Sequence, residues 1–402
     1  MDEVRNPFAP GAGTQPPELA GRGQILEQAQ LTLARAEQGR SARSFMLIGL
    51  RGVGKTVLLN RIAQMADEMR FRTILVEAHE DKKLAGLLLH PLRQLLLQLD
   101  ALGSVNDKVK RGLRILKSFA KSVKVKVGEF EIGLGIDAEK GVGDSGDLES
   151  DLPELFTAIG EAAKARKTVV LLLIDELQYL SQIELSALIM SIHKVNQKGL
   201  PLVLIGAGLP QLVGQMGKSK SYAERLFDFP TIGPLSAEDA MTAIVEPVTK
   251  EGERIAKAAA TAIMTETKGY PYFLQVWGYQ SWNAAPRSPI RVKDVEAAKP
   301  DVLRSLDESF FRVRFDRLTP AEKNYMRAMA ELGAGPHRSG DVAEILEVSV
   351  QSVAPTRNSL IRKGMIYSPA YGDTAFTVPL FDEFLKRQIP KFKSPPAFRP
   401  AK

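Results

Sequence analysis

Short apolar runs alternate with helical patterns between residues 18 and 235. The runs are almost continuously apolar, which is typical of strands buried on both faces of a parallel sheet. They fall at residues 45–48, 73–77, 169–174 and 202–206, with a fifth near 227–232. Because helical stretches occupy the intervals, the pattern predicts an α/β fold in which helices cover a parallel sheet.

The rest of the chain divides into four further segments. Residues 1–17 are rich in proline, glycine and small residues, and they predict a flexible arm. Residues 236–314 have a helical pattern that begins at Ser236 with an acid three residues later, and they predict a helical lid. A third unit follows at 315–390, and residues 391–402 form a basic tail.

An insertion at residues 87–151 separates the second and third predicted strands. It carries a run of lysines and arginines from 108 to 126, and apolar and polar residues alternate in it up to residue 136. This alternation predicts a β-hairpin. Two interpretations stay open: a contact for DNA or a neighbouring subunit, or a solvated basic helix beside an idle hairpin.

The composition narrows the function classes. The 402 residues include no cysteine, which excludes disulfides and thiolate metal sites and favours a reducing compartment. The four histidines are scattered without metal-ligand spacing. The apolar runs are too short to span a bilayer and no signal-peptide pattern is present, so we expect a cytoplasmic protein without a membrane partner. A net charge of +7 permits nucleic-acid binding.

A phosphate-binding loop lies directly after the first predicted strand. Its sequence fits G-x-x-x-x-G-K-[ST] and leads into a helical pattern, which is the context that this motif requires. Its backbone N–H groups and the helix N-terminus would surround a polyphosphate. Lys55 would reach the β- and γ-phosphates, and Thr56 would ligate Mg²⁺. The predicted nucleotide-binding residues of the loop are Gly49, Leu50, Arg51, Gly52, Val53, Gly54, Lys55 and Thr56.

Two carboxylates complete the predicted catalytic site. The third strand ends in Asp175 and Glu176, which places both at the carboxyl edge of the sheet, where ligands bind in such folds. Asp175 would hold Mg²⁺ through water, and Glu176 would orient and deprotonate the attacking water. The chain has no guanine-reading Asn-Lys-x-Asp tetrapeptide, which favours adenine. We therefore predict an ATPase that uses ATP and Mg²⁺.

Together the loop, the Asp-Glu strand, the helical lid and the third unit resemble AAA+ and STAND ATPases. The closest likeness is to archaeal-type ATPases related to the origin-recognition initiators, over residues 17 to about 387. This resemblance implies that the segment with Gly21 and Arg22 holds adenine. It also implies that Pro271, in a Gly-x-Pro pattern, opens a helix that closes over the base and ribose.

The resemblance also assigns an arginine finger to Arg225, which lies just before the fifth predicted strand. A finger acts on the nucleotide of a neighbouring subunit, so it implies self-association. An ion pair of Arg225 with Glu224 or Glu238 is the alternative. The fourth strand departs from the family, because Gly206 to Gly208 stand where a polar γ-phosphate sensor is usual. Gln211 is the nearest side-chain amide.

The third unit has the order of a winged helix-turn-helix. Helices are predicted from Thr319, over 339–346 and over 352–363, followed by strands at 365–367 and 375–378. Pro355 requires the third helix to start late. That helix would enter the major groove of double-stranded DNA. The predicted DNA contacts are Thr356, Arg357, Asn358, Arg362 and Lys363, with Tyr371 at the wing tip.

Two functional hypotheses follow. In the first, an AAA+-like ATPase controls a DNA-bound assembly in replication initiation, transposition or plasmid maintenance. In the second, a STAND-type switch hydrolyses ATP slowly and uses its winged helix for internal packing or for contact with a partner protein. The Gly-x-Pro pattern and the missing polar sensor favour the second hypothesis, and the intact loop, Arg225 and the winged helix favour the first.

Overall fold

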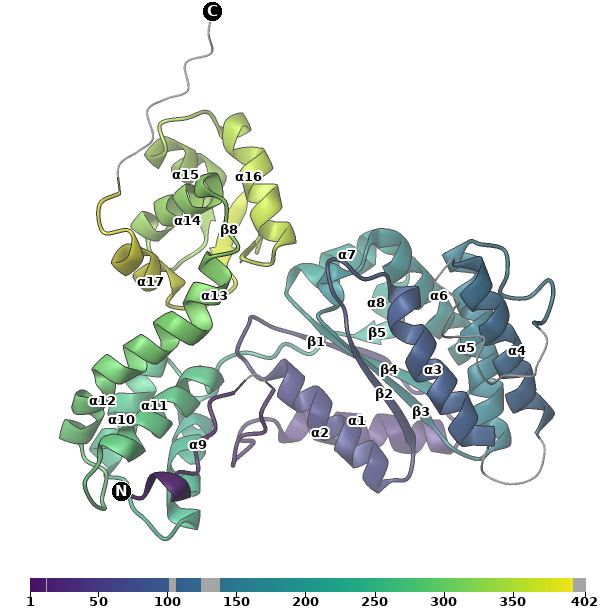
Figure 1. Cartoon of the computed structure of the whole chain (residues 1–402), viewed down its shortest axis with the longest axis horizontal. Helices are drawn as coiled ribbons and strands as arrows, with labels where there is room; N and C mark the ends of the chain where they lie inside the picture. The colour runs from purple at the N-terminus through teal and green to yellow at the C-terminus, as the bar shows by residue number, and fades with distance from the viewer. Residues whose placement is uncertain (12, 101–105, 124–137, 393–402) are drawn as a thin grey trace, which may run out of the picture.

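The core of the protein is a five-stranded sheet with the order β2-β3-β4-β1-β5 (Figure 1). The computed structural model describes residues 1–11, 13–100, 106–123 and 138–392. All neighbouring strands pair in parallel, as the apolar runs predict. The strands are β1 Ser44–Ile48, β2 Arg72–Glu77, β3 Val170–Asp175, β4 Leu202–Gly208 and β5 Phe227–Asp228. The fifth strand is shorter than expected, and beyond it a single bridge joins Ile48 to Thr231.

Alternate residues of the strands serve two hydrophobic cores. Phe45 and Leu47 belong to the core that includes α1 (Gly23–Glu37) and α2 (Lys55–Glu68). Met46 and Ile48 belong to the opposite core, which is covered by α3 (Leu84–Asp100), α5 (Leu148–Ala165) and α6 (Gln182–Gln197). The strands are apolar throughout because both of their faces are buried.

The insertion adds a helix, α4 (Asp107–Ser122), to the second core. The apolar face of α4 is buried, and its basic face pairs with carboxylates. Arg111 lies 3.1 Å from Glu139 and 3.4 Å from Glu161, and Lys108 lies 3.2 Å from Glu161. This part of the basic run is therefore partly neutralised by ion pairs. The hairpin predicted up to residue 136 lies outside the described residues.

Four helices follow the core: α9 (Ala237–Lys250), α10 (Lys257–Thr267), α11 (Pro271–Ala284) and α12 (Val292–Ser305). A π-helix, η4 (Leu306–Phe311), and the short α13 (Arg312–Phe315) then lead to the C-terminal unit (Figure 1). None of the helices in the described ranges is long and apolar enough to cross a membrane.

The N-terminal segment is not a free arm, contrary to the prediction for residues 1–17. It begins with a 3-10 helix, η1 (Glu3–Arg5), and packs against α11. Phe8 is 3% exposed and fills the space left by the missing side chain of Gly278, where a Cβ would lie 2.5 Å from the Phe8 ring. The indole of Trp282 donates to the Asp2 carbonyl at 2.7 Å. Residues 1–17 contain few large side chains, so their composition does not reveal these contacts.

The C-terminal unit contains the predicted three helices and hairpin. Its elements are α14 Pro320–Leu332, β6 His337–Arg338, α15 Ser339–Ile345, α16 Val350–Arg362, β7 Ile366–Tyr367, β8 Asp373–Phe376 and α17 Phe381–Gln388. The strands form an antiparallel sheet with the order β6-β8-β7, to which β6 is an unpredicted addition.

The third helix of this unit starts earlier than predicted. The Ser349 side chain accepts a hydrogen bond from the Ser352 N–H and caps α16 at Val350. Pro355 therefore lies inside the helix, in its second turn. The expectation of a late start is wrong because a serine cap fixes the first turn, and proline at this depth is accommodated.

Candidate nucleotide-binding site

The phosphate loop connects β1 to α2 at the carboxyl edge of the sheet. Gly52 and Gly54 have φ angles of 82° and 94°, a left-handed conformation that glycine adopts without strain. Gly49 lies against the neighbouring backbone, where a Cβ would be 2.2 Å from the Ile232 carbonyl oxygen. The glycines of the motif therefore serve both backbone conformation and close approach.

Lys55 is buried at the start of α2. Its ammonium group donates to the carbonyls of Gly49 at 2.9 Å and Leu50 at 2.8 Å, so it lies over the loop. Burial lowers the pKa of Lys55 to about 8, although Glu176 and Asp175 favour its charged form. A polyphosphate in the loop would bring the negative charge that this buried ammonium requires.

Thr56 and Asp175 meet across the loop and β3. The Thr56 hydroxyl donates to Asp175 Oδ2 at 2.5 Å, and burial raises the pKa of Asp175. A hydroxyl and a carboxylate are the hard oxygen donors that Mg²⁺ prefers, so the pair fits this ion. Magnesium bound here would neutralise charge on the phosphates. The described residues contain no cluster of three or more metal-ligating side chains, so phosphate and water oxygens would complete the coordination.

Glu176 follows β3 and has the left-handed φ of 54°. Both of its carboxylate oxygens have partners. Oε1 lies 3.3 Å from Arg51 Nη1, and Oε2 accepts a hydrogen bond from the side-chain amide of Gln178. Arg51 also donates to the Tyr179 hydroxyl at 2.7 Å. The predicted base is thus held by a network that includes a residue of the phosphate loop.

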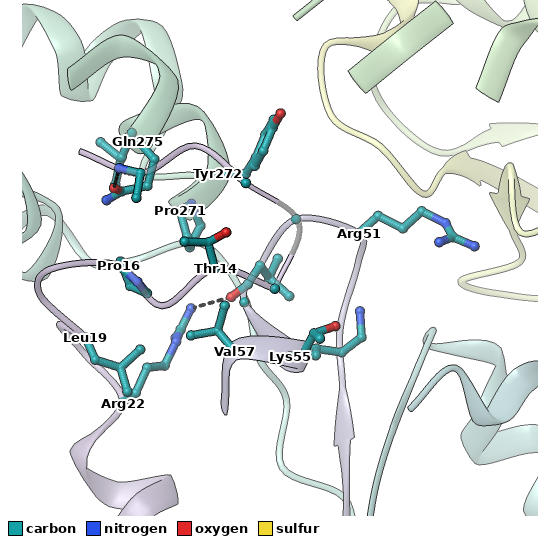
Figure 2. Close-up of a pocket in the computed structure, with 18 of the residues that line it drawn as sticks. Thr14, Pro16, Leu19, Arg22, Arg51, Lys55, Val57, Pro271, Tyr272 and Gln275 are labelled. Carbon is teal, nitrogen blue, oxygen red and sulfur yellow. Dashed lines mark hydrogen bonds between the residues drawn. The ribbon is translucent and has the colours of Figure 1, made fainter. Parts of the chain in front are cut away.

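A cavity of about 500 Å³ extends from the phosphate loop (Figure 2). The loop, Asp175 and Glu176 form one end, and the lid contributes Pro271, Tyr272 and Gln275. The N-terminal segment forms another wall with Ala9, Gly11, Gly13, Thr14 and Pro16. The core, the lid and the N-terminal segment together enclose one site.

Two of the family-implied nucleotide residues line this cavity. Arg22 donates to the carbonyls of Val53 at 3.2 Å and Gly233 at 2.6 Å, and Pro271 is the first residue of α11 (Figure 2). The Tyr272 N–H after it donates to the Gly52 carbonyl at 3.2 Å, so the lid contacts the phosphate loop directly. Gly21 is not in the lining.

Arg314 also lines the cavity, although no sequence motif marks it. Its guanidinium lies 4.2 Å from the centre of the Phe310 ring. Burial lowers the pKa of Arg314 to about 10, and the neighbouring Arg51 acts in the same direction. It is a second buried cation suited to phosphate. The N-terminal lining residues likewise carry no motif.

Arg225 lies away from the cavity, on α8 (Ala223–Leu226), and is exposed. In the described part of the chain it forms no ion pair with Glu224 or Glu238. Gln211, at the start of α7 (Gln211–Ser219), donates to the Ile361 carbonyl at 3.5 Å rather than facing Glu176. The side-chain amide next to the predicted base is therefore that of Gln178.

The C-terminal unit contacts the phosphate loop through Arg51. The Arg51 N–H donates to the Thr377 carbonyl at 3.1 Å, and its Nε donates to the Gly364 carbonyl at 3.4 Å. The missing side chain of Gly364 permits this approach, because a Cβ there would lie 2.9 Å from Arg51 Nη2. A more peripheral ion pair joins Arg317 to Glu80 at 3.3 Å.

The predicted DNA contacts divide into two groups. Arg357 donates to Thr374 Oγ1 at 3.1 Å and to the Asp373 carbonyl at 3.1 Å. Lys363 lies 2.8 Å from Glu322. Both cations are thus engaged within the unit. Thr356 is half-buried, and the exposed members of the set are Asn358, Arg362 and Tyr371.

Two family models match the chain. Residues 37–212 match a model described as AAA domain, and residues 308–385 match a model described as Domain of unknown function (DUF8462). A protein of Methanocaldococcus jannaschii, described as an uncharacterized HTH-type transcriptional regulator, is 23% identical over 371 residues, which cover 89% of this chain and 86% of that protein.

Solved structures are also similar. A Walker-type ATPase of Pyrococcus abyssi has a TM-score of 0.59 at 14% identity and covers 93% of this chain and 97% of its own. The Orc1 protein of Aeropyrum pernix, solved in complex with DNA, has a TM-score of 0.45 at 16% identity and covers 92% and 94%. At such identity the likeness to the Pyrococcus structure concerns the fold alone.

The parallel sheet, the phosphate loop and the match to the AAA domain show that this protein has the fold of the P-loop NTPases. Residues 37–212 form the AAA domain. This AAA domain carries both the phosphate loop and the Asp-Glu strand end.

Proposed function

We propose that this protein binds ATP with Mg²⁺ and hydrolyses it, and that its nucleotide state controls a DNA-bound assembly. The carrying observation is the convergence of Lys55, Thr56, Asp175 and Glu176 on one cavity at the sheet edge. Phosphoryl transfer needs positioning, charge neutralisation and an oriented water more than it needs covalent chemistry. These four side chains supply each of those requirements.

Each residue has one task in the proposed reaction. Lys55 binds the β- and γ-phosphates, while Thr56 and Asp175 hold the metal. Glu176 takes a proton from water as the water oxygen bonds to the γ-phosphorus and the bond from that phosphorus to the β,γ-bridging oxygen breaks. Glu176 must first exchange its contact with Arg51 for the water, because the ion pair occupies Oε1.

The direct test uses two substitutions. Glu176→Gln should bind ATP and retain it without turnover, because the amide cannot accept the proton. Lys55→Ala should fail to bind ATP. If Glu176→Gln turned over ATP at the rate of the unmodified protein, another group would have to be the base.

Exposed residues of the C-terminal unit support DNA as the partner. Asn358, Arg362 and Tyr371 lie on or beside α16 and the hairpin, in the order of a winged helix. The relative from Methanocaldococcus jannaschii is described as an HTH-type regulator, which agrees with this proposal. Arg225 is proposed to complete the site of a neighbouring subunit in the assembled form.

The contact of Arg51 with Gly364 and Thr377 favours a second candidate function, the regulatory switch. In this function the C-terminal unit docks beside the phosphate loop, and hydrolysis is slow while it remains there. The unit then serves packing or a partner protein rather than DNA.

Turnover with and without duplex DNA separates the two candidates. Hydrolysis that rises with DNA and with protein concentration supports the DNA-bound assembly. Tightly bound ADP that survives purification, with no DNA binding at low salt, supports the switch. Size measurements with an ATP analogue and DNA, separately and together, would report the assembly itself.

A further inference from the structure

The end of β4 contributes no polar side chain to the nucleotide site, and it has no room for one. A Cβ on Gly206 would lie 2.2 Å from Leu177 Cδ1, which is closer than real Cβ atoms approach. A Cβ on Gly208 would lie 3.0 Å from Gln178 Oε1. The polar group beside this strand end is therefore the side chain of Gln178, which comes from the neighbouring 3-10 helix η3 (Leu177–Tyr179).

The orientation of Gln178 is fixed by its partners. The side chain is 6% exposed, and its Oε1 accepts a hydrogen bond from the Leu209 N–H at 3.1 Å. A backbone N–H can only donate, so the amide oxygen must face Leu209. The amide NH₂ then faces Glu176, whose Oε2 accepts from it. Reversing the amide would place two donors together and an oxygen against a carboxylate.

Glu176 lies just after the end of β3, and its carboxylate is held by two side-chain contacts. It has φ 54° and ψ 36°, a left-handed conformation that is strained for a non-glycine residue. Of its two carboxylate contacts, the one with Arg51 is shared with the C-terminal unit. The contact with Gln178 belongs wholly to the core and joins the carboxylate to the end of β4.

We propose that Gln178 is a positioning residue for hydrolysis, which holds the Glu176 carboxylate in place of a side chain that β4 lacks. This inference rests on the proposed function, because it concerns the orientation of the general base. The Gln178 amide holds one carboxylate oxygen, Oε2, through a neutral hydrogen bond, whereas the Arg51 ion pair occupies the other, Oε1. When Arg51 releases Glu176, Gln178 keeps it aimed at the cavity.

The test replaces Gln178 with methionine, which has a similar length and no amide. Gln178→Met should lower the single-turnover rate of ATP hydrolysis by roughly 10- to 100-fold, while the Kd for ATP changes by no more than about threefold. Gln178→Glu keeps the acceptor for Leu209 but sets a second carboxylate against Glu176, and it should lose turnover in the same way. Gln197→Met, an exposed change on α6, is the matched control.

A double-mutant cycle separates positioning from a purely structural role. In a Glu176→Asp background, whose shorter carboxylate can still act as a base but no longer reaches the Gln178 amide, Gln178→Met should have little further effect on the residual turnover, because it acts through the residue already changed. Additive losses, unchanged turnover in Gln178→Met and Gln178→Glu, or weakened ATP binding in step with lost stability would overturn the role of Gln178. If Glu176→Gln itself had no effect, the base assignment in the proposed function would fail instead.

Discussion

The phosphate-loop edge and the C-terminal unit both gather charged residues that the sequence marks as functional, but they hold them differently. Lys55 and Thr56 lie where the motif predicts, because the backbone between β1 and α2 sets their positions. Arg357 lies on α16 and Lys363 caps its C-terminal end, beside exposed residues, yet both turn inward onto partners in their own unit. The spacing of residues in the sequence predicts where a side chain lies if the backbone conformation of the motif fixes its position. It fails if contacts with neighbouring side chains determine which way the side chain points.

The two regions meet at Arg51. This residue belongs to the phosphate-loop motif, and its guanidinium contacts Glu176, Tyr179 and the Gly364 carbonyl. A variable position of the motif thus forms the contact between the predicted base and the C-terminal unit. We therefore expect different effects from changes in the phosphate loop, in the N-terminal wall of the cavity, and at the junction where Arg51 contacts the C-terminal unit.

The largest expected effect concerns the loop itself. Lys55→Ala should weaken ATP binding on the order of 100-fold or more, because it removes a buried cation from the phosphates. Titration with a fluorescent ATP analogue measures the affinity. Arg40→Ala, an exposed change after α1, is the control. An affinity within threefold of that of the unmodified protein would mean that the phosphates bind elsewhere.

A smaller effect is expected from the N-terminal wall of the cavity. Phe8→Ala removes the anchor that holds Ala9, Gly11 and Thr14 beside the loop, so bound nucleotide should dissociate about tenfold faster. Stopped-flow displacement of labelled ADP measures the rate. Val4→Ala changes an exposed residue of the same segment and serves as the control. Equal dissociation rates would mean that the segment merely packs on the lid.

The strands, the loop and Asp175 with Glu176 were predictable because each depends on local pattern. The N-terminal wall was not, because Phe8 finds its place against Gly278, which is far away in the chain. Arg314 was not predicted, because it follows a π-helix and its guanidinium packs on the Phe310 ring, and no sequence motif marks either feature. Pro355 misled the prediction of α16, because the helix begins at the Ser349 cap and contains the proline in its second turn. A contact between distant segments decided the first of these cases, and local geometry that no motif records decided the other two.

The junction should give a more modest change. Arg51→Ala removes the hydrogen bonds of its guanidinium to Gly364 and Tyr179, and should loosen the C-terminal unit. We expect a larger radius of gyration in small-angle scattering and turnover raised about three- to fivefold as Glu176 loses its ion-pair partner. Arg312→Ala, an exposed change on α13, should alter neither. Slower turnover with unchanged dimensions would mean that Arg51 acts on the nucleotide and does not restrain the unit.

The smallest predicted effect is the uptake of a fraction of a proton by Lys55 when Mg²⁺-ATP binds. Burial lowers its pKa to about 8 from the ordinary 10.5, so folding disfavours the charged form. The stability of the nucleotide-free protein should therefore rise as the pH increases from about 8 to 10.5, because the unfolded chain holds the extra proton over that window.

Bound phosphates favour the charged ammonium of Lys55 and return its pKa toward the ordinary value. Binding of Mg²⁺-ATP at pH 8 should then take up roughly half a proton at Lys55, and about a tenth at pH 7. Calorimetry in two buffers with different ionisation enthalpies measures this uptake. Equal uptake at both pH values would show that the ammonium is already fully charged in the free loop, and that its backbone carbonyls hold it as firmly as a phosphate does.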